Sequence, residues 1–244
     1  MKTKSFIVII FSSIVLLFTI GYVLFQVSKL RTFQFFGGIT HRVNTNKKVL
    51  ALTFDDAPSN YSDEVVDMLE EKGIKATFYA IGQSIEKYSN ETKNIIAHGH
   101  ELGNHSYSHQ RFLLKSPSFV ETEIQKTNEL LRNSGYKDEI TFRPPNGKKL
   151  ISLPWYLQRN NIKTIMWDVE PDTYVPKALS EKEKIQFLVD YTVSHTKSGS
   201  IILIHPFCEN NCAADRQALR QIIGELQSEG YRFVTISELL TYDR

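Results

Sequence analysis

The stretch VLALTFDDAP, residues 49–58, organises the chain. Its first six residues are apolar or β-branched, which predicts a buried strand that ends near the proline. Asp55 and Asp56 stand together where the strand ends. Successive side chains of a strand point to opposite sides, so these acids would diverge unless the turn re-aims one of them. One could hold a metal ion while the other handles a proton; a turn that caps a helix starting near Ser62 is the structural alternative.

Composition favours one globular domain of ordinary size with an accessory segment. The chain has 244 residues, and its 29 basic and 27 acidic residues nearly balance to a net charge of +2, which favours no polyanionic partner. Basic residues do not form a stripe with interleaved aromatics, so we expect no nucleic-acid partner. We expect the protein to be a monomer.

The accessory segment is the N-terminus. After a short tail, residues 1–5, no charged residue occurs in residues 6–27, which are long enough to cross a bilayer as a helix. We predict a single-pass membrane anchor with an extracytoplasmic domain. A cleaved signal peptide, which would make the protein secreted, is the alternative, but its apolar part is usually only ~7–15 residues long. Residues 28–47 are predicted to be a linker, and residues 48–242 the globular domain.

From residue 48 onward, short β-forming runs alternate with amphipathic runs, which predicts repeated βα units and a parallel sheet. The length suits a distorted (β/α) barrel with about seven parallel strands, in which chemistry gathers at the carboxyl ends of the strands. The predicted strands are Val49–Phe54, Ala76–Ile81, Glu101–Asn104, Ile140–Arg143, Lys163–Trp167, Ser200–Ile204 and Arg232–Thr235. The predicted helices are Ser62–Lys72, Glu91–His98, Ser118–Ser134, Glu181–Thr196 and Asp215–Glu229.

Two histidines four residues apart, His105 and His109, follow the third predicted strand. On a helical turn this spacing places both imidazoles on one face, as two ligands of one zinc ion require. Surface or core histidines would give the same pattern. His98 and His100 are interpreted as structural.

Polar and aromatic residues also follow the later strands. Arg143 precedes two prolines that make the turn rigid, and it could face Asp55 and keep that carboxylate ionised, although a surface arginine is the alternative. Residues 167–174, WDVEPDTY, combine three acids with two aromatics and suit sugar binding, or else form a turn with core aromatics. His205, after the sixth predicted strand, could donate a proton near neutral pH.

Five motifs stand in one order: TFDDAP at 53–58, HSYSH at 105–109, RPPNG at 143–147, WDVEPD at 167–172 and LIHP at 203–206. With these motifs, residues 48–242 resemble the polysaccharide deacetylases of the NodB-homology family of carbohydrate esterases. The resemblance implies a distorted (β/α) barrel. It also implies metal-dependent removal of N- or O-acetyl groups from a polysaccharide such as peptidoglycan, xylan or chitin-type oligomers.

The resemblance also implies roles for single residues. Asp56, His105 and His109 would be the metal ligands, with Zn²⁺ expected first and Co²⁺, Ni²⁺ or Mn²⁺ as alternatives. Asp55 would be the general base, oriented by Arg143, and His205 the general acid. The backbone N–H of Asn146 would hold the oxyanion. The remaining substrate contacts would come from Pro145, Trp167, Asp168 and Tyr174.

The chain departs from the family pattern at two places. Ala57 replaces the usual glycine after the two acids. Thr173 and Tyr174 stand where the family often has an aspartate that supports the catalytic histidine and a tryptophan. Asp172 or Asp168 could supply the missing carboxylate. Without one, the domain would be a weakened, carbohydrate-binding member of the fold; a tethered structural or partner-binding domain is a third possibility.

The two cysteines, Cys208 and Cys212, follow His205 closely. In an exported chain an even pair favours a disulfide. Such a bond would hold the loop beside the predicted acid. A second metal site is the alternative, but two cysteines supply too few ligands.

Overall fold

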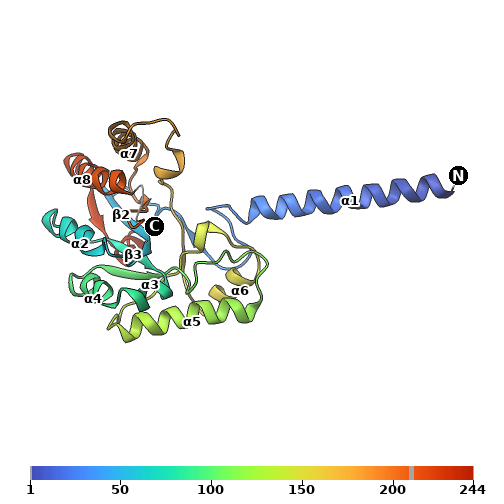
Figure 1. The fold of residues 1–244 in the computed structure, drawn as a ribbon, viewed down its shortest axis with the longest axis horizontal. Coiled ribbons are helices and arrows are strands. Elements are labelled where there is room, and N and C mark those ends of the chain that lie inside the picture. Colours follow the sequence, from blue (N-terminus) through green and yellow to red (C-terminus); the bar gives the residue numbers. More distant parts are fainter. Residues whose placement is uncertain (1, 209–211, 244) are drawn as a thin grey trace.

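The computed structural model describes residues 2–208 and 212–243. Helix α1, Lys2–Val27, projects away from a barrel-shaped domain (Figure 1). Its part Ile9–Val27 is long and apolar enough to cross a membrane, and none of it is buried against the domain. Length and composition of this kind fit a membrane span or a signal sequence.

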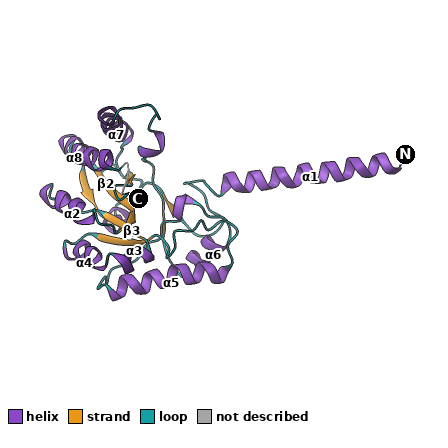
Figure 2. Ribbon diagram, in the orientation of Figure 1, coloured by secondary structure: helices purple, strands orange, loops and turns teal. Residues whose placement is uncertain are grey.

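The domain has short strands at its centre and helices around them (Figure 2). The strands are β1 Ile39–Thr40, β2 Val49–Ala57, β3 Thr77–Ala80, β4 Glu101–Asn104, β5 Thr164–Ile165, β6 Ile201–Ile204 and β7 Arg232–Val234. The α-helices after α1 are α2 Ser62–Glu71, α3 Gly82–Lys87, α4 Ser89–Ala97, α5 Pro117–Asn133, α6 Ser152–Arg159, α7 Glu181–His195, α8 Ala213–Ser228 and α9 Ile236–Leu240. Two 3₁₀ turns are η1 Pro145–Gly147 and η2 Asp172–Tyr174.

Strand β2 is the central strand of the barrel. It pairs in parallel with β3 on one edge and β6 on the other, and its first residues also pair with β7. Its residues alternate between two cores: Leu50, Leu52 and Phe54 pack with the surrounding helices, whereas Val49 and Ala51 face the barrel interior. The predicted barrel of parallel strands is confirmed, with each of the five predicted helices ending within two residues of its predicted bounds.

The barrel closes through isolated contacts rather than long strands. The predicted strand Ile140–Arg143 is reduced to Phe142, which bridges Asn104 on one side and Thr164 on the other. The prolines that follow Arg143 have no N–H to continue a ladder, which explains this reduction. On the far side, Val169 bridges Ile202 in β6.

Residues 28–47 differ from the predicted linker. Ile39 and Thr40 form β1 and pair with β5, and Arg42 bridges Ser200, the residue before β6. Val43 is buried in the interior core. The segment therefore fills the side of the barrel between β5 and β6, because its apolar residues find a core to bury in.

Candidate functional site

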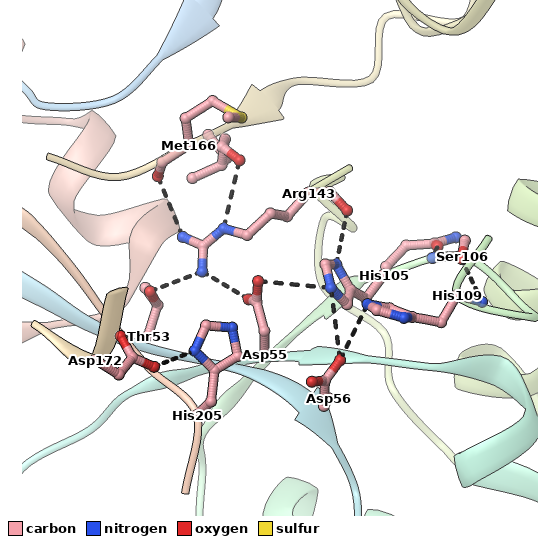
Figure 3. A network of polar contacts seen from close by, with 12 residues as sticks. Thr53, Asp55, Asp56, His105, Ser106, His109, Arg143, Met166, Asp172 and His205 are labelled. Carbon is pink, nitrogen blue, oxygen red and sulfur yellow. Dashed lines mark hydrogen bonds and ion pairs between the residues drawn. The ribbon is translucent and has the colours of Figure 1, made fainter. Parts of the chain in front are cut away.

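A pocket of about 420 Å³ opens at the carboxyl ends of the strands. Most of the side chains that the sequence singled out converge on it from different loops (Figure 3). The residues that line it are Lys29, Arg31, Asp55, Asp56, His105, His109, Asn146, Gly147, Lys148, Met166, Trp167, Glu170, Thr173 and His205.

A backbone irregularity at the end of β2 brings both acids to this pocket. Asp55 continues the interior-facing positions of β2 and is buried, with 3% of its surface exposed. Asp56 would face the helices, but the register with β3 shifts between Phe54 and Ala57, and Asp56 has a φ of +64°. Aspartate tolerates this left-handed conformation better than most residues. The bulge therefore re-aims Asp56 beside Asp55. Ala57 has no positive φ, so an alanine is tolerated there.

The two histidines lie on a loop, not on the helical turn that the spacing suggested. Ser106 and His109 have φ values of +68° and +55°, and the turn brings the imidazole centroids to 5.1 Å from each other. His109 N–H donates to Ser106 Oγ at 3.0 Å. The pair is therefore brought together by a tight turn rather than by helical spacing.

A buried acid that the sequence analysis did not single out, Glu123 of α5, holds this loop. Its carboxylate accepts hydrogen bonds from the backbone N–H of Tyr107 and Ser108 at 3.1 and 2.8 Å and from Ser108 Oγ at 2.9 Å. The side chain of Asn104 accepts from Ser106 N–H at 2.7 Å. The sequence offered one sign of this contact with the loop: Glu123 is an acidic residue on the apolar face of a predicted helix.

Asp56, His105 and His109 form a group that could hold a metal ion, with their ligand atoms within 4.8 Å of one another. His105 Nδ1 donates to the carbonyl of Arg143 at 2.8 Å, which leaves the Nε2 lone pair facing the acids. Asp56 Oδ1 lies 3.8 Å from His105 Nε2 and 3.3 Å from His109 Nε2. This oxygen is buried and accepts no hydrogen bond from the residues that the structure describes. An unsatisfied carboxylate oxygen between two imidazole lone pairs fits a cation.

The pKa of His109 agrees with that fit. Burial and the neighbouring His105 lower the pKa of His109. A lowered pKa favours the neutral imidazole, which is the form that binds metals.

Arg143 is fully buried, and its partners hold its guanidinium against Asp55. Its Nη1 donates to Asp55 Oδ1 and to Thr53 Oγ1, both at 2.8 Å, and its Nη2 donates to the carbonyl of Met166 at 3.2 Å. The guanidinium also lies 4.1 Å from the centre of the Tyr79 ring. A buried guanidinium with this many partners holds the carboxylate of Asp55 in a fixed position.

The charge of Asp55 is maintained by its neighbours. Burial alone would raise its pKa, but the charge and hydrogen bond of Arg143, with contributions from His105 and His205, outweigh burial, and the pKa of Asp55 lies below its ordinary value. Asp55 is therefore ionised at neutral pH and available to accept a proton.

The carboxylate beside His205 comes from Asp172, which resolves the choice between Asp172 and Asp168. Asp172 Oδ2 accepts a hydrogen bond from His205 Nδ1 at 2.5 Å. Burial would lower the pKa of His205, but Asp172, with help from Asp55 and Asp56, raises it to about 9. Asp168 instead accepts from Ser200 Oγ and from the N–H of Ile201, outside the pocket.

The remaining predicted contacts divide into two groups. Asn146, with a φ of +53°, and Trp167 line the pocket. Pro145 and Tyr174 do not line it; Tyr174 is half exposed and stacks on Tyr191.

Other residues near the site have structural partners. Cys208 and Cys212 are joined by a disulfide with a Cα–Cα distance of 5.5 Å. Outside the pocket, His98 Nδ1 donates to the carbonyl of Asn94, and buried His100 accepts from Ala76 N–H.

Comparisons with known proteins agree with this architecture. The family model described as polysaccharide deacetylase matches residues 42–165. A peptidoglycan-N-acetylglucosamine deacetylase of Bacillus cereus is 32% identical over 207 residues, which cover 84% of this chain and 94% of that relative. A peptidoglycan-N-acetylmuramic acid deacetylase of Bacillus subtilis is 27% identical over 199 residues, which cover 81% and 73% of the two chains.

A solved structure gives the same result in three dimensions. The crystal structure of a peptidoglycan N-acetylglucosamine deacetylase in complex with a substituted N-hydroxybenzamide superposes with a TM-score of 0.75 at 29% identity. The superposition covers 84% of this chain and 94% of that one. The family match, the relatives and the shared barrel agree with the motif order in the sequence, and the chain therefore belongs to the polysaccharide deacetylase family.

Proposed function

We propose that this protein is a metal-dependent hydrolase that removes acetyl groups from N-acetylated sugars of peptidoglycan. The observation that carries the proposal is one pocket lined by Asp55, by the Asp56–His105–His109 group and by His205, which is hydrogen-bonded to Asp172. The names of the relatives support peptidoglycan as the polymer. O-acetylated sugars and chitin-type oligomers are further substrates to test.

We propose Asp56, His105 and His109 as the ligands of a divalent ion, with zinc as the native metal. Two imidazoles and one carboxylate leave an open position, as catalytic zinc sites do. When bound, such an ion supplies Lewis acidity, which makes water a better nucleophile and polarises the acetyl carbonyl.

Asp55 is suited to act as general base. It lies beside the proposed ligands, with Oδ2 3.5 Å from His105 Nε2, and its other oxygen is held by Arg143. Because its pKa is lowered, it is ionised before the reaction and can take a proton from the attacking water.

Protonation of the leaving nitrogen is assigned to His205. Its raised pKa keeps it as an imidazolium at neutral pH, and it lines the same pocket as the proposed base. The backbone N–H of Asn146 is the proposed donor to the developing oxyanion. Together these residues supply an acid, a base and an oxyanion donor.

The carbohydrate-binding alternative depended on a missing carboxylate beside the catalytic histidine. Asp172, one residue earlier in the chain than expected, accepts the hydrogen bond of His205, which supports the deacetylase over this alternative. We also propose that α1 anchors the domain on the outer side of the membrane, since the substrate polymer is extracytoplasmic.

The test is acetate release from peptidoglycan and from N-acetylglucosamine oligomers by the purified full chain. Treatment with a chelator should lower release more than tenfold, and added Zn²⁺ should restore it, because the proposed ligands hold the ion only through exchangeable bonds. Binding of metal and sugar without release would support the carbohydrate-binding alternative. Absence of both would favour a tethered structural domain.

The hydrogen bonds from Glu123 to the histidine loop predict that this residue affects the affinity for the metal ion. Glu123→Ala should weaken Zn²⁺ binding about 10- to 100-fold, because the loop that carries His105 and His109 loses its three hydrogen bonds to this carboxylate. Competition with a fluorescent chelator measures the affinity. Glu121→Ala, on the exposed side of the same helix, is the control and should bind Zn²⁺ like the parent. Equal affinities for both variants would contradict the positioning role.

A further inference from the structure

The residues that follow α1 form part of the pocket wall. Ser28 is fully buried, and its carbonyl accepts from the N–H of Lys149 at 3.1 Å. The Nζ of Lys149 donates to the carbonyl of Leu30 at 2.5 Å. Arg31 lies 4.8 Å from the centre of the Trp167 ring and pairs with Glu170 at 2.5 Å. We call residues 28–31 the post-helix segment; these contacts fasten it to the domain.

Two lysines bring uncompensated charge to this wall. Lys29, from the post-helix segment, and Lys148, after η1, both line the pocket. Neither forms an ion pair with a residue that the structure describes. Both ammonium groups instead lie near the ring of Phe25, at 4.5 and 4.8 Å from its centre. Partial burial, followed by the charges of Lys29 and Arg111, lowers the pKa of Lys148.

The acids of the pocket do not neutralise these lysines, because each has another cationic or imidazole partner. Asp55 is bound by Arg143, Glu170 is paired with Arg31, and Asp56 faces the two histidines. Keeping two ammonium groups together costs free energy, which an anion between them would recover. The wall is therefore arranged for an anionic group of the ligand.

We propose that Lys29 and Lys148 bind a carboxylate of the substrate, so that the post-helix segment selects saccharides with a carboxylate on or next to the acetylated sugar. The proposal rests on the deacetylase function above. N-acetylmuramic acid is such a sugar: its carboxylate belongs to a lactyl group, joined through an ether oxygen to the ring carbon next to the one that bears the acetamido group. With the acetamido group at Asp55, this carboxylate is the anionic group of the sugar nearest to the reacting bond, and Lys29 and Lys148 line the same pocket.

An anionic lipid head group is the rival occupant, since Lys29 follows the end of α1 at Val27 by two residues. The shared pocket favours the substrate: both lysines line the cavity that holds Asp55 and Asp56. The lipid remains an outcome of the test.

The experiment uses the full chain in nanodiscs of zwitterionic lipid and two matched substrates. One is peptidoglycan glycan strands without stem peptides; the other is the same strands with their carboxylates converted to methylamides. We expect kcat/KM to be about tenfold higher for the acid than for the amide. Lys29→Gln with Lys148→Gln should bring the ratio close to one, mainly by raising KM for the acid. Raising the salt concentration should lower the parent's ratio, since salt screens charge.

Lys93→Gln with Lys137→Gln is the matched control. It removes the same charge from exposed positions that do not line the pocket, and it should keep the parent's ratio. Mass spectrometry of the products identifies which sugar has lost its acetyl group.

Binding separates this proposal from the deacetylase function. Calorimetry on Asp55→Asn chains, which should not consume the substrate, should show the same preference for the acid strands and its loss in the lysine variant. Equal affinity for the two strands would overturn the lysine proposal even if both are deacetylated. Preferential binding without acetate release would overturn the deacetylase function alone. An effect of the lysine variant only on binding to anionic vesicles would overturn the proposal in favour of the lipid.

Discussion

Asp55→Asn should lower kcat about a thousandfold while the chain still binds its metal ion. Asparagine has nearly the same shape and can still accept the hydrogen bond of Arg143 Nη1, now 2.8 Å from Asp55 Oδ1. The amide cannot accept a proton at neutral pH, so the proposed base is lost while the proposed metal ligands remain. Acetate release and elemental analysis of the purified variant measure the two effects.

The neighbouring acid provides the contrast. Asp56→Asn should lose most of its metal affinity, because the orphaned oxygen between the two imidazoles loses its charge. If Asp55→Asn lost the metal and Asp56→Asn kept it, the two acids would have the opposite roles. Asp55→Asn also leaves buried Arg143 without its counter-ion, which should lower the free energy of unfolding by about 3–5 kcal/mol. A thermal melt should therefore accompany the assay.

The repeated elements of the barrel could be predicted because their signals are local. Leu50, Leu52 and Phe54 alternate with the interior positions of β2, and the helices carry apolar residues at helical spacing. The motif residues could be located because they follow the predicted strands, and parallel strands bring their carboxyl ends together. Sequence periodicity thus located the strands, and their parallel arrangement predicted that the loops at their carboxyl ends meet.

What the sequence could not supply depends on backbone detail and on distant partners. The bulge that re-aims Asp56 is invisible to a period-two pattern, and the turn at Ser106 replaces the helical spacing that was expected. The choice of Asp172 over Asp168 depends on the course of η2, because Asp168 is occupied by Ile201 and Ser200. The post-helix segment carries no motif, so only its packing shows that it belongs to the pocket.

Asp172→Asn should shift the alkaline limb of the pH profile to lower pH. As the proposed acid, His205 would act in its imidazolium form, which is present below its pKa and is lost as the pH rises through it. Asp172 is the main cause of the rise of this pKa to about 9, so a neutral asparagine should let it fall toward the ordinary value of 6.5. We expect kcat to drop about tenfold at pH 8 and less than about threefold at pH 6. Values of kcat measured across this pH range show directly where the alkaline limb lies.

Two further variants test whether the shift of the alkaline limb reports the pKa of His205. His205→Ala should bind metal normally and lose about a hundredfold in kcat at every pH, because the acid itself is gone. Asp190→Asn, which removes a charge from the exposed face of α7, should leave the profile of the parent unchanged. The other charges around His205 are the same in the parent and in Asp172→Asn. The difference in pH between their alkaline limbs therefore measures the effect of the Asp172 carboxylate alone. A loss of the same size at pH 6 and pH 8 would show that Asp172 only supports the loop, whereas an unchanged rate in His205→Ala would remove this histidine from the reaction.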